Sequence, residues 1–387
     1  MSLRVVFAGS PAFSLPTWQA LLAADGVEVV GVYTGPDRRA GRGRAPRLSA
    51  VKEAALAAGA VTVTDGAAAG AVTVTDGAAQ QSAPEMPLKV PPKIPIFQPE
   101  SLRDDAAVEA LRRLRPDLMV VVAFGLLLPA AALAIPRLGC VNLHASLLPR
   151  WRGAAPIARA VEAGDAVSGV SLMQMDAGLD TGPVLAAARV AIGAHDTAGD
   201  LHDKLAEQAA RLLAENLRPL AAGELTATPQ DAARACHAPK LTKAEAQLDW
   251  RRDAAALERQ VRAFQPWPVA FADVGGVGGL RLRALRAAVG AAPAGARRGE
   301  IVAANADGIV IAAGRGALTL TVVQRPGGRA MTAGDFLNGA KITPGMRCVV
   351  APGDAADGAA GDAKTAPGGT AETVAATTVA AESPTTP

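Results

Sequence analysis

The sequence of 387 residues is poor in aromatic residues and contains no long apolar run, and each shortage excludes a class of protein. Aromatic residues make up 3% of the chain, so broad stacking of single-stranded nucleic acid on aromatic side chains is not expected. No apolar run reaches the roughly 20 residues that a membrane helix requires. The N-terminus also lacks the basic and apolar regions of a signal peptide. We therefore expect no association with a membrane.

Cysteine is scarce as well. Cys140, Cys236 and Cys348 lie too far apart to form a disulfide framework or a CxxC metal site. The histidines are scattered, so no metal site is expected either. This pattern favours a reducing compartment, and we expect a cytoplasmic protein. Half of the residues are hydrophobic, which is enough for two folded domains of about 100–200 residues each.

Positive charge is concentrated in two parts of the chain. Residues 36–47 carry five arginines against Asp37, and residues 247–349 contain 14 basic residues against 7 acidic residues. Residues 350–387 carry five acidic residues against one lysine. A basic loop and a basic domain favour a polyanionic partner. Because the loop is dense in Gly, Pro and Arg, no regular element is predicted within it.

Apolar strand segments alternate with helical segments over residues 1–222. The predicted strands cover residues 3–8, 27–33, 93–97, 117–124, 139–144, 168–175 and 183–192. The predicted helices cover a stretch that ends near Ala24 and residues 49–59, 104–114, 127–134 and 197–221. Because most of these strands are apolar throughout, they favour burial on both faces of a mainly parallel sheet. We therefore predict an α/β catalytic domain with a Rossmann-like, doubly wound sheet.

Differences in composition divide the rest of the chain into an insert, a linker, a second domain and a tail. Residues 60–92 contain the sequence AVTVTDG twice, followed by a proline-rich stretch, and form a low-complexity insert. Residues 223–246 lack a clear element and are predicted to be a linker. Residues 247–349 show short β-like runs between glycines, which predicts an OB-like barrel. Residues 350–387 have few large apolar side chains and are predicted to form a disordered tail.

The chemistry is expected in the stretch GCVNLHASLLPRWRGAAPI, residues 139–157. Asn142 and His144 are two residues apart, so on a strand they point to the same face. They come at the expected carboxyl end of that strand, where α/β sheets form ligand crevices. An amide that binds a carbonyl oxygen beside an imidazole that moves a proton suits acyl transfer. In the stretch MDAGLDTGPV, a Gly-rich turn presents Asp180, whose carboxylate would orient His144.

These two stretches occur with six others: VVFAGSPAF, PDRRAGRGR, VVVAFGLLLP, PKLTKAEAQLDW, RAFQPWPVAF and VVQRPGGRAM. Together they resemble the 10-formyltetrahydrofolate-dependent formyltransferases, and more narrowly the methionyl-tRNA formyltransferase family. The resemblance extends over most of residues 1–349. It implies a monomer that takes the formyl group from 10-formyltetrahydrofolate, without a metal, and transfers it to the α-amine of initiator methionyl-tRNA for translation initiation.

The resemblance also implies roles for individual residues. Asn142 would polarise the formyl oxygen, His144 would stabilise the oxyanion and help to transfer a proton, and Asp180 would tune His144. The implied folate pocket comprises Phe124, Gly125, Leu126, Leu127, Ser146, Leu147, Leu148, Pro149 and Asp176. The implied tRNA contacts are Arg38, Arg39, Arg42, Arg44 and Lys240. The chain has Phe124 where the family usually has Tyr, which removes one hydroxyl from the pocket.

Two alternatives can be weighed against this interpretation. A folate-dependent formyltransferase that acts on a small-molecule amine would use the same core, but the basic loop and the second domain argue against it. An RNA-binding protein with an inactive core is opposed by the intact set of amide, imidazole and carboxylate. His195, His202 and His237 have no comparable sequence context and are predicted to be structural.

Overall fold

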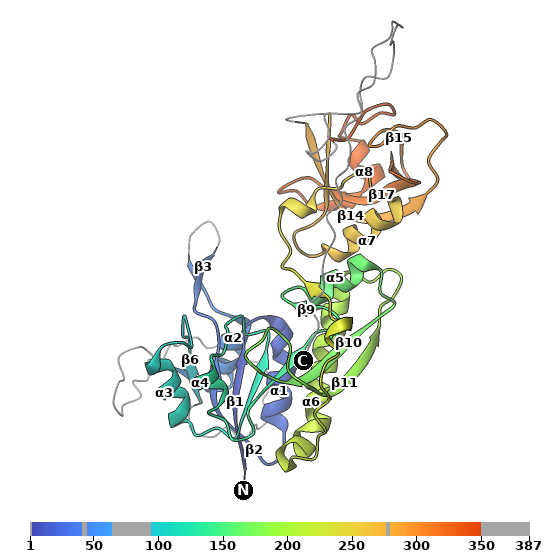
Figure 1. The fold of residues 1–387 in the computed structure, drawn as a ribbon. Coiled ribbons are helices and arrows are strands. Elements are labelled where there is room, and N and C mark those ends of the chain that lie inside the picture. The colour runs from blue at the N-terminus through green and yellow to red at the C-terminus, as the bar shows by residue number, and fades with distance from the viewer. Residues whose placement is uncertain (1, 41–44, 64–93, 276–278, 350–387) are drawn as a thin grey trace, which may run out of the picture. The chain divides into compact units, whose positions relative to one another are not determined.

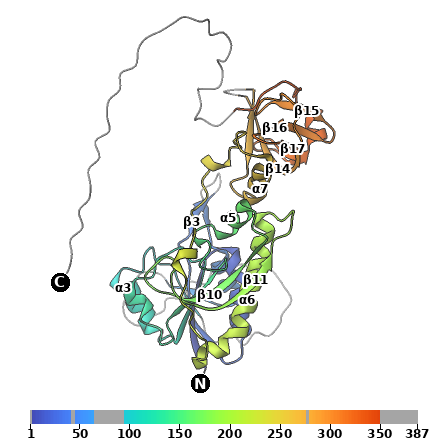
Figure 2. The same cartoon turned by 45° about the vertical axis from the view of Figure 1, so that its right-hand side comes forward.

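A computed structural model describes residues 2–40, 45–63, 94–275 and 279–349 of the chain (Figures 1 and 2). Most of the predicted insert, residues 64–92, and the whole predicted tail lie outside the described residues. Arg42 and Arg44 lie outside them too, and only the backbone of Arg39 is described. Among the described residues, no helix is both long and apolar enough to cross a membrane.

Eight strands form the central sheet of the N-terminal part. They are β1 (Leu3–Gly9), β2 (Val27–Tyr33), β5 (Val61–Thr62), β6 (Pro95–Phe97), β7 (Leu118–Val122), β8 (Cys140–His144), β10 (Val167–Gln174) and β11 (Val184–Ala191). Their order is β11-β10-β8-β7-β1-β2-β6-β5. All neighbours from β8 to β5 are parallel, and β10 and β11 are antiparallel at one edge. The predicted mainly parallel sheet is therefore confirmed.

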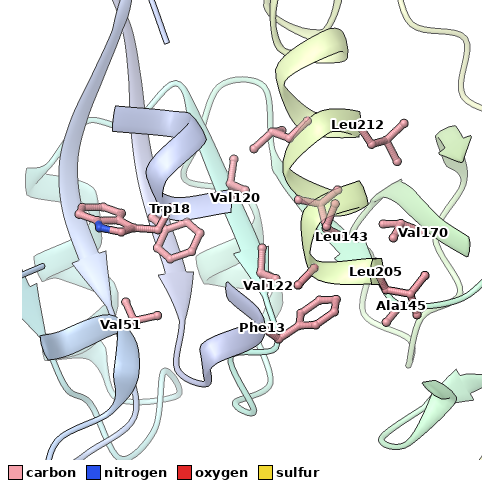
Figure 3. Close-up of a cluster of buried hydrophobic side chains, with 14 of the residues drawn as sticks. Phe13, Trp18, Val51, Val120, Val122, Leu143, Ala145, Val170, Leu205 and Leu212 are labelled. Carbon is pink, nitrogen blue, oxygen red and sulfur yellow. The ribbon is translucent and has the colours of Figure 1, made fainter. Parts of the chain in front are cut away.

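Helices cover both faces of this sheet because the strands are apolar on both sides. The helices are α1 (Leu15–Ala23), α2 (Ala50–Ala57), α3 (Asp105–Arg113), α4 (Ala130–Leu133), α5 (Pro156–Ala163) and α6 (Ala198–Ala222). Val5 and Phe7 pack in one apolar cluster with α1, α2 and α6, and Val6 and Ala8 pack in another with α3 and α4. This alternation follows from the two-residue period of a strand. Figure 3 shows the first cluster, which holds the fully buried Trp18.

A second, antiparallel sheet follows in the C-terminal part. Its strands are β13 (Phe271–Val274), β14 (Leu280–Gly290), β15 (Ile301–Asn305), β16 (Gly308–Ala312), β17 (Ala317–Gln324) and β18 (Ala330–Thr332). The order is β13-β14-β17-β16-β15, with β18 paired to β17. The sheet has its own apolar core around the fully buried Trp250 and Ile309. This curled sheet confirms the OB-like prediction, and helices α7 (Ala254–Ala263) and α8 (Ala333–Leu337) add to it.

Two segments contain more regular structure than their composition predicts. The basic loop, expected to lack regular elements, forms β3 (Arg38–Ala40) and β4 (Ala45–Arg47), which pair as an antiparallel hairpin. Backbone pairing between the two arms thus outweighs the weak strand propensity of these residues. Within the predicted linker, β12 (His237–Ala238) pairs in parallel with β9 (Arg152–Gly153). The division at residues 222, 246 and 349 stays a prediction.

Candidate active site

Asn142 and His144 lie at the carboxyl end of β8, between β7 and β10. Asn142 is paired with Val121 of β7 and Met173 of β10. Both side chains line one cavity of about 1170 Å³, which Asp180 also lines. His144 is only 6% exposed, so the protein rather than bulk water sets its surroundings. The structure therefore brings the three predicted catalytic side chains to one cavity.

Two contacts define how the His144 ring is held. Its Nε2 lies 2.9 Å from the carbonyl oxygen of Trp151, and its Nδ1 lies 3.6 Å from Oδ2 of Asp180. A carbonyl oxygen can only accept, so Nε2 carries a hydrogen and donates it to Trp151. The distance from Nδ1 to Asp180 is longer than a normal hydrogen bond. Nδ1 is therefore the ring nitrogen that faces the carboxylate of Asp180.

The carboxylate of Asp180 is fixed from the backbone. Oδ2 accepts the N–H of Gly153 at 2.9 Å, and the side chain is 14% exposed. Asp180 itself has φ of 53°, a left-handed conformation that is unfavourable for a residue with a Cβ. Gly153 has φ of 119°, and a Cβ there would lie 2.9 Å from the carbonyl oxygen of Ala238. Only glycine therefore allows β12 to pack this closely on the residue that holds Asp180.

The structure divides the predicted folate residues into two groups. Five of them line the cavity with the catalytic side chains: Phe124, Gly125, Leu126, Leu127 and Asp176. Oδ1 of Asp176 accepts the N–H of Gly178 at 2.9 Å and the hydroxyl of Thr181 at 2.7 Å, so this carboxylate also shapes the turn. Leu127 and Leu179 are 65% and 52% exposed at the cavity and provide apolar surface.

The other group does not line this cavity, and its place in the folate pocket stays a prediction. It comprises Ser146, Leu147, Leu148 and Pro149, none of which is among the described lining residues. Ser146 is fully buried, and its hydroxyl donates to the carbonyl oxygen of Arg150 at 2.6 Å. The backbone N–H of Leu148 donates to Ser171 at 3.0 Å. Hydrogen bonds within the turn after β8 and to Ser171 of β10 thus hold this segment in place.

Several residues at the cavity were not singled out from the sequence. His202 and His237, predicted to be structural, both line it, as do Gln265 and Trp267 from the segment after α7. Phe13 packs edge-on against His202 with ring centroids 5.3 Å apart. Gln265 and Trp267 lie in the stretch RAFQPWPVAF, which carried the resemblance but suggested no role for them. No quoted stretch contains His202 or His237, and their proximity to the site depends on the tertiary fold.

The predicted tRNA contacts that are described lie on exposed surface. Arg38 on β3 and Lys240 after β12 are exposed, and neither lines the cavity. The base of the β3–β4 hairpin is anchored by Lys52, whose ammonium group donates to Asp37 at 2.7 Å and to Gln98 at 2.6 Å. Burial raises the pKa of Asp37, but the hydrogen bonds from Lys52 and Gln98 outweigh burial and lower it overall.

Two further facts concern the cysteines and the metal-ligating side chains of the described residues. All three cysteines are free thiols, and burial raises the pKa of Cys140 to about 12. A thiol with such a pKa is protonated and a poor nucleophile near neutral pH. No group of three or more His, Cys, Asp or Glu side chains among the described residues could hold a metal ion.

Comparisons with known proteins agree with this architecture. Residues 3–217 match the family Formyl transferase, and residues 240–341 match Formyl transferase, C-terminal domain. A methionyl-tRNA formyltransferase of Stenotrophomonas maltophilia (strain K279a) is 51% identical over 87% of this chain and 97% of its own length. A protein of the same name from Nitrosococcus oceani is 46% identical over 91% of this chain and 98% of its own length.

A solved structure shares the fold at low identity. It is an N-formyltransferase from Helicobacter canadensis in complex with folinic acid and dTDP-3-aminofucose, 13% identical, with a TM-score of 0.56. The match covers 82% of this chain and 99% of that one. Because the two family matches and the close relatives together span both sheets, the chain belongs to the methionyl-tRNA formyltransferase family of the formyl transferases.

Proposed function

We propose that the chain transfers the formyl group of 10-formyltetrahydrofolate to the α-amino group of methionine on initiator methionyl-tRNA, giving N-formylmethionyl-tRNA. The observation that carries the proposal is the convergence of Asn142, His144 and Asp180 on one cavity. The relatives that bear the name methionyl-tRNA formyltransferase support this acceptor. The alternative, a small-molecule amine, is not favoured because the chain has five arginines over residues 36–47 and a basic second domain.

The residues present fit a folate donor. The loop 124–128 brings apolar side chains and backbone polar groups to the cavity wall, and Met175 and Leu179 face it from the β10–β11 turn. A flat ring system with polar edges is well matched by apolar walls that carry a few placed donors and acceptors. 10-Formyltetrahydrofolate supplies the formyl group and the leaving nitrogen. We propose that Phe124–Leu127 and Asp176 hold it.

The three catalytic side chains have separate tasks. The α-amine of methionine attacks the formyl carbon, and the bond from that carbon to the donor nitrogen breaks. The amide of Asn142 donates to the formyl oxygen and stabilises the negative charge that develops there. Nδ1 of His144 accepts the proton that the attacking amine loses and returns one to the leaving nitrogen. Asp180, 3.6 Å from Nδ1, stabilises the ring while it is positively charged.

We propose that the tRNA is bound by the exposed Arg38, by the other arginines of the hairpin and by Lys240. Guanidinium groups bind phosphates through paired hydrogen bonds. The ion pair of Lys52 and Asp37 fixes the residue directly before the exposed Arg38. The basic residues of the second domain, which we assign to residues 247–349, would add contacts along the tRNA.

The chain's assembly and location follow from the same proposal. We propose a catalytic domain over residues 1–222, a linker over 223–246 and a tRNA-binding domain over 247–349. Because Asn142, His144 and Asp180 of a single chain meet at one cavity, we propose a monomer. Because formylation serves translation initiation, we propose that the protein is cytoplasmic.

A formylation assay tests the proposal. Purified protein is mixed with labelled 10-formyltetrahydrofolate and either methionyl-tRNA or an amino sugar nucleotide, and the labelled product is separated. We expect transfer to methionyl-tRNA, and loss of transfer when His144→Ala replaces the wild type. Transfer to the amino sugar nucleotide alone would contradict the proposed acceptor, and full activity of the variant would contradict the proposed role of His144.

A further inference from the structure

The segment of residues 228–238, here called the strap, crosses the catalytic segment although the sequence predicts only a linker there. Thr228 and Val184 exchange two backbone hydrogen bonds of 2.9 Å. At the other end, the carbonyl oxygen of Cys236 accepts the N–H of Arg152 at 3.0 Å. The strap is therefore bonded both to the strand that follows Asp180 and to the segment that precedes Gly153.

Gln230 lies near the start of the strap, and its side-chain amide makes hydrogen bonds to two different segments. Its Nε2 donates to the carbonyl oxygen of Asp180 at 2.9 Å and to that of Gly182 at 2.7 Å. Its Oε1 accepts from Nε and Nη2 of Arg152 at 3.0 and 2.8 Å. A glutamine amide has two hydrogens to donate and one oxygen with two acceptor positions, so all its capacity is used. The opposite orientation of the amide would place its hydrogens against the guanidinium donors.

These contacts connect Asp180 with the segment around Gly153, whose N–H binds the Asp180 carboxylate. Gln230 binds the carbonyl oxygen of Asp180, whose backbone has a positive φ and needs support from its surroundings. Through Arg152 it also binds the residue next to Gly153, whose N–H holds the Asp180 carboxylate. The turn at Gly182 is tight as well, since a Cβ there would lie 1.9 Å from the carbonyl oxygen of Gln174. Gln230 thus ties together the residue that presents the carboxylate and the segment that receives it.

We propose that Gln230 is a positioning residue that keeps the carboxylate of Asp180 within reach of His144. The inference rests on the proposed function, because it concerns the same formyl transfer. Gln230 is not among the residues that line the described cavity, so it acts through Asp180. A positioning residue of this kind affects the chemical step more than substrate binding, because a small displacement of a catalytic group slows the reaction steeply.

The variants Gln230→Met and Gln230→Glu test the proposal by steady-state formylation of methionyl-tRNA. Methionine keeps the length of the side chain but removes every hydrogen bond. Glutamate keeps the contact with Arg152 but places an oxygen against the two carbonyl oxygens. We expect kcat to fall about 10- to 100-fold in both variants, with KM for each substrate within about twofold of the wild type.

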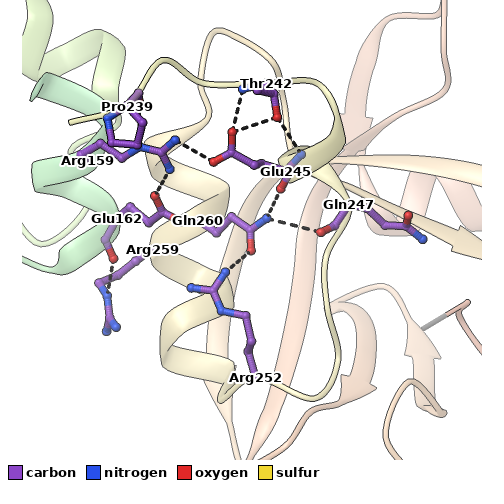
Figure 4. A network of polar contacts seen from close by, with 9 residues as sticks. All are labelled: Arg159, Glu162, Pro239, Thr242, Glu245, Gln247, Arg252, Arg259 and Gln260. Carbon is purple, nitrogen blue, oxygen red and sulfur yellow. Dashed lines mark hydrogen bonds and ion pairs between the residues drawn. The ribbon is translucent and has the colours of Figure 1, made fainter. Parts of the chain in front are cut away.

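Gln260→Met provides the matched control, because Gln260 makes the same kind of bridge in the C-terminal part (Figure 4). Its Nε2 donates to the carbonyl oxygen of Glu245 at 2.7 Å, and its Oε1 accepts from Arg252 at 2.9 Å. The side chain is 2% exposed and is not among the described residues that line the cavity. We expect this variant to lower the thermal midpoint while kcat stays within about twofold of the wild type.

A double-mutant cycle with Asp180→Asn separates positioning from a general loss of structure. If Gln230 acts through Asp180, its replacement has little further effect on kcat once the carboxylate is gone. Unchanged kcat in both Gln230 variants, or an undiminished effect in the Asp180→Asn background, would overturn the inference while leaving the proposed function intact. If Gln230→Met does not fold, the cycle is completed with Gln230→Glu. Absence of formyl transfer by the wild type would instead overturn the proposed function.

Discussion

Replacing Asp180 with asparagine removes one charge from the site while preserving its shape. Asparagine keeps an oxygen that can accept the N–H of Gly153, so the turn is expected to survive. The carboxylate lies 3.6 Å from Nδ1 of His144, with both side chains largely buried. At an effective dielectric constant of about 20, a full negative charge at this distance stabilises a positive ring by about 4.6 kcal/mol. Because each 1.36 kcal/mol is tenfold in rate, Asp180→Asn should lower kcat by up to about 2,000-fold.

The assay is single-turnover formylation with saturating methionyl-tRNA and donor, so that the chemical step is measured rather than binding. Asp117→Asn is the control, since Asp117 also accepts a backbone N–H, from Arg4 at 3.0 Å, and faces a cation, Arg137 at 3.2 Å. It is not among the described residues that line the cavity, and its replacement should leave the rate unchanged. A rate for Asp180→Asn within about threefold of the wild type would refute the proposed electrostatic role.

Three further outcomes are expected. Gly153→Ala should destabilise the protein by about 2–4 kcal/mol in urea unfolding, because φ of 119° is strained for alanine and its Cβ would meet the carbonyl oxygen of Ala238; an unchanged midpoint would contradict this. Arg38→Ala should weaken tRNA binding, and the slope of the logarithm of the binding constant against the logarithm of the salt concentration should become about 1 less steep. KM for the donor should stay constant. The same slope in the variant and the wild type would exclude a phosphate contact. The hydrogen bond from the N–H of Arg4 and the charge of Arg137 lower the pKa of Asp117. Ionised Asp117 therefore adds to the free energy of unfolding at pH values above its pKa in the unfolded chain, near 3.8, and this contribution is lost as pH falls through its lower pKa in the folded protein. The stability deficit of Asp117→Asn at pH 7 should therefore shrink in acid unfolding, and a constant deficit would contradict the assignment.

The central sheet could be predicted because each of its strands is specified by a short, continuous stretch of sequence. Apolar runs such as that of β7 are long enough to require burial on both faces, and the spacing of Asn142 and His144 puts them on one side of β8 by the geometry of any strand. The approach of Asp180 to His144 was an expectation from a shared motif rather than from spacing. Its geometry depends on the way in which β10 and β11 turn back beside β8.

The contacts that hold the site in place could not be predicted in this way. Gln230 sits in a segment without apolar periodicity, and its partners lie about 50 and 80 residues away in the sequence. Ser146 and its neighbours directly follow β8, yet they are not among the described residues that line the cavity. Helix α7 was missed although Leu257 and Val261 have helical spacing, because the surrounding β-like runs dominate the pattern.

The atoms that hold His144 and Asp180 belong to the main chain, at Trp151 and Gly153 respectively. An exchange of side chain at position 151 cannot delete a carbonyl group, so the anchor of the imidazole is tolerant of sequence drift at that position. What it does not tolerate is a change in chain length. An insertion or deletion between residues 144 and 153 would shift both anchors at once. The length of this segment therefore constrains the site more than the identity of most of its residues.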